Sequence, residues 1–352
     1  MVSARWTALV LIAALAAGVA GCGSSDRQGT TVRKVAFVAP YGDNEPDWTL
    51  QAQEVVEEWP RRLHVRVDKV DASQTDDIRG ALEQVSHERN QLVIAHDSRY
   101  ADAAEAVARK TGVPELVWGE RSDPPDGLVG EITMPGATAG GYMAGLVTAK
   151  AAYARNLGIV VIADGSAWDT ATWNRMAGAF IAGARSIDPR EKFHYVQVGE
   201  DGTATVKQVH DATRRMIDDG AQMVFALGGA ATVGTLRALT EAGGEDQYVG
   251  VIGDKARFNT ENNVLVSVMV DTRPAFEQAL RDLRTGRFGE HPYKLTLRNR
   301  GIWLFQTGRT PADAYEAGIR AGAQVEKGRI KVPETPTRAA VDALLAGETP
   351  EG

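Results

Sequence analysis

The sequence predicts an α/β fold of two lobes, each a parallel sheet flanked by helices, joined by a hinge. The first observation is that short apolar segments alternate with helix-length segments from residue 34 to residue 252. Strands separated by single helices form right-handed βαβ units, and such units build a parallel sheet. The second observation is the length of 352 residues, which suits about two domains. The third is that the alternation falls into two successive arrays of similar size, the layout of a two-lobed binding protein.

The N-terminus is typical of an exported lipoprotein. Arg5 precedes an apolar run at residues 6–17, and small residues then lead to Cys22, the only cysteine. We therefore expect a lipoprotein signal peptide at residues 1–21, and a lipidated Cys22 that begins a flexible tether at residues 22–32. A transmembrane anchor is the alternative, but the run is shorter than the roughly 20 residues that span a bilayer. An ordinary cleaved signal peptide is the other alternative, and it leaves the position of the single cysteine unexplained.

The first array begins at residues 34–39, a short apolar run that reads as a buried strand. Residues 63–68 alternate in polarity as a half-buried strand does, and residues 75–85 open with a helix cap and continue at helical spacing. The expected strands of this array are 34–39, 63–68, 91–95 and 115–118, and its expected helices are 48–61, 75–85 and 100–111.

The second array repeats this pattern. Its expected strands are 157–163, 193–198, 223–227 and 248–252, and its expected helices are 137–152, 173–186, 204–219 and 231–241.

The chain beyond residue 263 is expected to complete both lobes. A strand at 264–270 and a helix at 273–285 would return the chain to the first lobe. Residues 294–305 are typical of a β-hairpin, and helices at 311–325 and 336–346 close the structure. The sequence thus predicts two lobes with these bounds: lobe I at residues 33–134 plus 264–290, and lobe II at residues 135–263 plus 291–346.

Charge and motifs argue against several other classes of protein. The 46 acidic residues outnumber the 39 basic ones, for a net charge of −7, so we expect no nucleic-acid binding. A single cysteine excludes a disulfide framework and a four-cysteine zinc site. The sequence has no phosphate loop, no nucleophile elbow and no metal-type histidine pair. His96 and Asp97 could form an acid–base pair, but adjacent strand residues point apart. We expect no catalytic residue, no metal and no cofactor.

Polar and aromatic residues gather in the loops that follow the strands. In open parallel sheets, ligands bind beyond the carboxyl ends of the strands. Acid, amide and aromatic side chains there suit a neutral polyhydroxylated ligand with a flat ring. The candidate ligand-binding residues from these loops are Asp43, Asn44, Asp47, Trp48, Asp97, Trp173, Arg175, Gly228 and Asp254.

Each candidate also has a purely structural interpretation. Asp97 and Asp254 could cap helices, and Asp43 and Asp47 could form turns. Trp48 could anchor a helix to the core. Trp168 and Trp173 are expected in a polar loop, where an indole needs a partner. Gly228 could serve a tight turn. Their common position at strand ends is what favours a site.

Motifs along nearly the whole chain are similar to those of one known family. The segment at residues 141–150, Gly-Tyr-Met-Ala-Gly-Leu-Val-Thr-Ala-Lys, is similar to a helix of that family, and residues 179–184 to its Gly-Phe-x-x-Gly element. Residues 216–225, 264–268 and 328–333 resemble three further motifs. By these motifs the chain resembles the basic membrane protein family, which consists of bacterial lipoproteins that serve as substrate-binding components of ABC importers, many of them for purine nucleosides. The resemblance implies the type I periplasmic-binding-protein fold.

The binding motifs differ from the family pattern at several positions. Asp47-Trp48-Thr49 stands where the family has Ser-Phe-Asn, so the resemblance gives Trp48 the base-stacking role. Asp254 matches the second acid of a family motif whose first acid is lost here. Val270 stands where nucleoside binders have a lysine, and Met176 falls near a family stacking phenylalanine.

The sequence therefore predicts a monomeric, lipid-anchored solute-binding protein on the extracytoplasmic face of the cell membrane. It would bind a nucleoside between its lobes, with Trp48 and Trp173 stacking on the ligand, and deliver it to an ABC permease. The alternatives are a surface sensor or regulator of the same fold that binds a sugar-like molecule without transport, and an exported enzyme on this scaffold.

Overall fold

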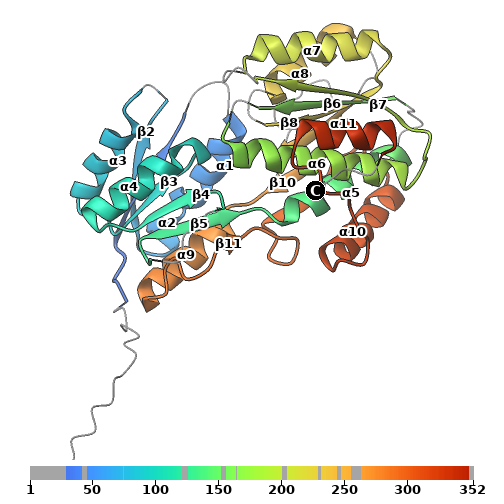
Figure 1. Ribbon diagram of the computed structural model, residues 1–352. Coiled ribbons are helices and arrows are strands. Elements are labelled where there is room, and N and C mark those ends of the chain that lie inside the picture. The colour runs from blue at the N-terminus through green and yellow to red at the C-terminus, as the bar shows by residue number, and fades with distance from the viewer. Residues whose placement is uncertain are drawn as a thin grey trace, which may run out of the picture.

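A computed structural model describes residues 29–41, 46–73, 75–120, 126–151, 156–163, 165–199, 204–228, 231–243, 247–254 and 263–348. The predicted signal peptide, Cys22 and most of the tether lie outside these residues, as do Asp43 and Asn44. The described residues form two six-stranded sheets, one in each lobe (Figure 1). The predicted two-lobed α/β fold is therefore confirmed.

The sheet of lobe I has the strand order β11-β5-β4-β3-β1-β2, and all of its neighbouring strands are parallel. Its strands are β1 (Lys34–Ala39), β2 (Arg66–Asp71), β3 (Leu92–Ala95), β4 (Glu115–Trp118), β5 (Val129–Thr133) and β11 (Tyr293–Lys294). Its helices are α1 (Pro46–Glu57), α2 (Trp59–Arg62), α3 (Ile78–His87), the 3₁₀ helix η1 (Ser98–Tyr100), α4 (Ala101–Thr111) and α9 (Arg273–Thr285).

Alternate residues of the central strand β1 pack on opposite faces of this sheet, as the two-residue period of a strand requires. Ala36 and Val38 face a core cluster with residues of α3 and α4. Val35 and Phe37 face a second cluster with residues of α1, α2 and α9. Both faces are thus covered by helices, which explains why β1 is apolar after Lys34.

The sheet of lobe II has the order β12-β10-β9-β8-β6-β7, and only β12 runs antiparallel to its neighbour among these described strands. Its strands are β6 (Asn156–Ile162), β7 (Lys192–Val198), β8 (Met223–Leu227), β9 (Gln247–Ile252), β10 (Val264–Val270) and β12 (Ile302–Gln306). Its helices are α5 (Gly136–Ala151), α6 (Ala167–Arg185), α7 (Val206–Asp218), α8 (Ala231–Ala242), α10 (Ala312–Glu326) and α11 (Arg338–Ala346). Figure 1 shows α7 and α8 on one face of this sheet and the other four helices on the opposite face.

Helix α6 begins six residues before the predicted start at residue 173. Ser166 caps it, because its hydroxyl accepts from the Asp169 amide at 3.2 Å while the Asp169 carboxylate accepts from the Ser166 amide at 3.3 Å. Trp168 and Trp173 therefore lie on a helix, and their predicted placement in a polar loop is wrong.

Helices α5 and α6 pack closely because glycine lies at their contact. A Cβ atom on Gly145 would overlap the carbonyl oxygen of Phe180, and one on Gly183 would overlap that of Tyr142. The first of these glycines belongs to the family-like segment at residues 141–150, so that motif has a packing role.

The division of the chain between the lobes differs from the prediction after residue 263. Strand β10 was expected in lobe I, but it pairs with β9 and β12 in the sheet of lobe II. Only α9 and the segment up to β11 return to lobe I, where Phe276 of α9 packs against Phe37. The predicted hairpin at 294–305 is also wrong, because β11 joins the first sheet and β12 the second.

Two smaller differences concern single strands of lobe I. Strand β2 lies three residues later than residues 63–68, and β5 was not predicted at all. Among the described residues, no helix combines the length and the apolar character needed to cross a bilayer.

Candidate functional site

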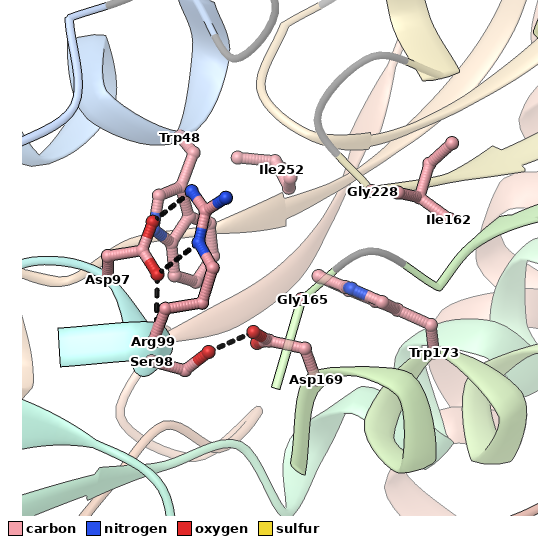
Figure 2. A pocket seen from close by; sticks show the side chains of 10 residues that line it. All are labelled: Trp48, Asp97, Ser98, Arg99, Ile162, Gly165, Asp169, Trp173, Gly228 and Ile252. Atoms are coloured by element: carbon pink, nitrogen blue, oxygen red, sulfur yellow. Dashed lines mark hydrogen bonds and ion pairs between the residues drawn. The ribbon is translucent and has the colours of Figure 1, made fainter. Parts of the chain in front are cut away.

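A cleft lies between the two lobes at the carboxyl ends of their strands (Figure 2). It contains about 480 Å³ of space free of protein atoms, part of it open to solvent. Lobe I contributes four of the described lining residues and lobe II contributes six: Trp48, Asp97, Ser98 and Arg99 from lobe I, and Ile162, Gly165, Asp169, Trp173, Gly228 and Ile252 from lobe II.

The lobes touch each other across this cleft. The Ser98 hydroxyl of η1 donates to a carboxylate oxygen of Asp169, near the start of α6. Burial raises the pKa of Asp169 to about 6, against the lowering effect of this hydrogen bond. The rings of Trp118 and Trp168, with centroids 6.1 Å apart, make a second contact between the lobes.

Asp97 is engaged with its neighbour Arg99. Its carboxylate accepts from the Arg99 Nε at 2.9 Å and Nη2 at 2.5 Å, and from the Arg99 amide at 2.8 Å. The last bond caps η1, as the structural interpretation of this aspartate expected. Asp97 is 5% exposed, so its main effect on the cleft is to hold the Arg99 guanidinium there.

In lobe I, one ring that lines the cleft is supported from behind by two further rings. Trp48, on the first turn of α1, stacks on His96 with centroids 5.2 Å apart and an angle of 19° between the rings. Its other neighbour is Trp118, 4.5 Å away at 48°. Trp48 lines the cleft, whereas His96 and Trp118 are buried behind it.

The indole of Trp173 extends from α6 toward the cleft (Figure 2). The residue is 6% exposed, and within the described part of the chain its Nε1–H has no hydrogen-bond partner. An indole can only donate, so Trp173 offers a hydrogen bond to an acceptor in the cleft.

Gly228 brings the backbone after β8 close to β6. Its φ is +107°, a value that side chains disfavour, and a Cβ there would lie 2.6 Å from the Cβ of Ile162. Glycine is therefore required by the turn, and the close approach forms part of the cleft wall.

The structure brings together four of the ten predicted ligand-binding residues: Trp48, Asp97, Trp173 and Gly228 all line the cleft. Met176 is 1% exposed in the core beneath α5, Arg175 pairs with Glu334 at 3.4 Å, and Asp254 follows β9 outside the described lining. Asp43, Asn44 and the side chain of Asp47 lie outside the described part of the structure.

Sequence reasoning did not select Ser98, Arg99, Asp169 or the two isoleucines. Ser98 and Arg99 directly follow Asp97, so the sequence indicates that they lie at the same strand end. It does not indicate that Ser98 bonds to Asp169 or that Arg99 pairs with Asp97. Asp169 could have been found through the Ser166-x-x-Asp169 capping pattern, which marks a helix start facing the cleft. In the described residues, no group of three His, Cys, Asp or Glu side chains could hold a metal ion.

Several solved structures share this fold. An ABC transporter solute-binding protein from Conexibacter woesei is 20% identical, with a TM-score of 0.66 over 86% of this chain and 99% of that one. One from Aeropyrum pernix is 14% identical, with a TM-score of 0.72 over 90% of this chain and 97% of that one. A periplasmic solute-binding protein from Actinobacillus succinogenes with bound D-allose is 16% identical, with a TM-score of 0.61 over 79% and 98%. No curated protein matches the chain by sequence.

Residues 32–290 match the family described as ABC transporter substrate-binding protein PnrA-like. This match covers most of the chain and every described strand except β11 and β12, and it agrees with a cleft that lies between two lobes. Proteins of this family bind a small-molecule solute outside the cytoplasm for an ABC permease, and they are not enzymes. The chain therefore belongs to the family of PnrA-like ABC transporter substrate-binding proteins, and it is an extracytoplasmic solute-binding protein.

Proposed function

We propose that the protein captures a purine nucleoside in the cleft between its lobes. The observation that carries this proposal is the wall around Trp48, a ring that lines the cleft and is supported from behind by two further rings. A flat base gains most from such a wall, because stacked aromatic pairs add about 0.5–1.5 kcal/mol beyond the area they bury.

The polar groups of the cleft suit a neutral ligand. Arg99 and Asp97 neutralise each other as a bidentate ion pair. Trp173 supplies a donor from lobe II, and Asp169 supplies a carboxylate, an acceptor for a ribose hydroxyl. A nucleoside offers both ring acceptors and hydroxyl donors, so it can use residues of both lobes at once.

Contact with both lobes gives the ligand its effect on the conformation. A solute that binds the closed form better than the open form shifts the population toward closure. Closure brings the two lobes together around the solute, as in hinge closure of other two-lobed proteins. The permease can then recognise the closed form.

A thermal-shift experiment tests nucleoside capture. The chain without residues 1–22 is heated with adenosine, guanosine or inosine, and a ligand at 100 times its dissociation constant should add about 2.7 kcal/mol. Trp48→Ala should abolish the shift, whereas the matched control Trp303→Ala, on β12 away from the cleft, should retain it. An unchanged shift in Trp48→Ala would refute stacking on this ring.

A sugar-like ligand is the second candidate. The similar structure from Actinobacillus succinogenes carries D-allose, and aromatic walls also bind the apolar face of a sugar ring. A midpoint raised by D-allose but by no nucleoside would favour this reading. No response to either compound would favour a surface sensor that acts without transport.

We also propose that a lipid on Cys22 holds the protein at the membrane. The support is the sequence alone: an apolar run followed by small residues and the single cysteine. Cell fractionation tests it, because Cys22→Ser should move the protein from the membrane fraction to the soluble fraction. Retention in the membrane fraction would indicate an uncleaved anchor instead.

A further inference from the structure

We propose that His96 is a positioning residue that fixes the orientation of Trp48, so that the ring-binding wall of the cleft is formed before the solute arrives. The inference rests on the proposed function, because it concerns the ring that would stack on the solute. His96 itself does not line the cleft; it would act through Trp48.

His96 is held rigidly in its place. It directly follows β3, and its amide donates to the carbonyl of Val38 at 2.8 Å. The side chain is fully buried. The ring centroid of Phe37 lies 5.2 Å from that of His96, and the ring of Phe276 lies 6.1 Å away, edge to face. These two rings belong to the core of lobe I, and they restrict the orientation of the imidazole.

The partners of the two ring nitrogens determine the tautomer. Trp118 Nε1, 3.1 Å from Nδ1, can only donate, so Nδ1 is the unprotonated acceptor. The carbonyl of Trp48, 3.1 Å from Nε2, can only accept, so Nε2 carries the proton. A single neutral tautomer therefore satisfies both bonds. Burial supports this state, because it lowers the pKa of His96 to about 4.

These contacts restrain Trp48 at two points. Nε2 of His96 holds its backbone carbonyl, and the imidazole stacks against its indole. Trp118, which also packs against Trp48 and lies 5.7 Å from the His96 ring, is itself held by Nδ1 of His96. One imidazole thus fixes both tryptophans. A preorganised ring saves the cost of ordering a side chain on binding.

His96→Phe separates the hydrogen bonds from the ring. The phenyl ring keeps an aromatic surface, but it neither accepts from Trp118 nor donates to Trp48. The same substitution at His87, an exposed residue at the end of α3, is the matched control.

The first readout needs no ligand. The protein is labelled with 5-fluorotryptophan, and its ¹⁹F resonances are assigned through single Trp→Phe variants. We expect one sharp Trp48 resonance in the parent and in His87→Phe, and a broadened or split one in His96→Phe, with the Trp303 resonance unchanged. An identical Trp48 resonance in His96→Phe would overturn the inference.

The second readout is adenosine affinity, measured by calorimetric titration. His96→Phe should weaken binding by about threefold to tenfold, the loss expected when a binding side chain has to be ordered on association. Equal affinity in His96→Phe, together with lost binding in Trp48→Ala, would overturn the positioning role and leave the proposed function standing. Normal affinity in Trp48→Ala would instead refute the proposed stacking.

Should His96→Phe fail to fold, the unsubstituted protein still decides the question. Its ¹⁵N spectrum should show His96 protonated at Nε2 and unprotonated at Nδ1, and the opposite tautomer would overturn the inference. Trp118→Phe, which removes the donor to Nδ1 and leaves a smaller ring beside Trp48, should shift the His96 Nδ1 signal and the Trp48 resonance together. A Trp118→Phe protein with both signals unchanged would also overturn it.

Discussion

Glu115 should make the stability of the protein fall as the pH rises above about 4.5. It is the first residue of β4, it is fully buried, and neither of its carboxylate oxygens has a hydrogen-bond partner in the described structure. Burial alone raises the pKa of this carboxyl to about 9, because a charge without a partner is disfavoured in a protein core.

The size of the effect follows from this pKa. In the unfolded chain the carboxyl has its usual pKa of 4.5, so below that pH both states are protonated and nothing is lost. Above it the unfolded chain ionises while the folded one keeps its proton, and each pH unit costs about 1.4 kcal/mol until the folded pKa is reached. At pH 7 the loss is about 3 kcal/mol, or about 5 °C in melting temperature for a chain of this length.

Glu115→Gln removes the titration and keeps the shape of the side chain. Melting temperatures of parent and variant, measured from pH 4.5 to pH 8, should separate as the pH rises, with the variant the more stable by an increasing margin. Glu316→Gln, at an exposed site on α10, is the control and should follow the parent. A difference between Glu115→Gln and the parent that stays constant over this range would show that Glu115 ionises in the folded protein, and would refute the reasoning.

Three further substitutions test the cleft contact and the packing of α6. Burial raises the pKa of Asp169 from 3.8 to about 6, so the parent protein gains stability as the pH is lowered from 6 to 3.8. Asp169→Asn should flatten this part of the plot of melting temperature against pH. Parallel plots for parent and variant would contradict the buried placement. Gly145→Ala, whose Cβ would overlap the carbonyl of Phe180, should cost about 1–3 kcal/mol in denaturant unfolding, and an unchanged midpoint would mean that the helices are not so close. Ser166→Ala should cost about 1 kcal/mol in the same assay while Ser166→Asn restores it; equal losses in both would rule out capping.

The order of strands and helices could be predicted because it is written in local patterns. The segment at 34–39 is apolar after Lys34, and a strand buried on both faces is the simplest structure it can form. Local patterns do not determine to which lobe a strand belongs. Residues 264–270 read equally well as a strand of either sheet, because the choice depends on pairing with β9 and β12, which no pattern within these seven residues encodes.

The position of the site could be predicted better than the roles of its residues. Strand ends placed Trp48, Asp97 and Trp173 at one edge, and the structure brings all three to the cleft. That Asp97 binds Arg99, two residues later, depends on the local backbone of η1 and on side-chain rotamers. The contact between Ser98 and Asp169 joins residues of two lobes, and no local pattern encodes how two lobes meet.

The hydrogen bonds that already exist in the cleft limit the kinds of solute that it can bind. The carboxylate of Asp97 already accepts three hydrogen bonds from Arg99, and Asp169 accepts from Ser98 across the cleft. An anionic solute would have to compete with Asp97 for the guanidinium, and a cationic one would meet carboxylates that are already bonded. A neutral ring can stack on Trp48 without breaking either set of bonds. We therefore expect the cleft to select its solute by ring shape and hydrogen bonds more than by charge.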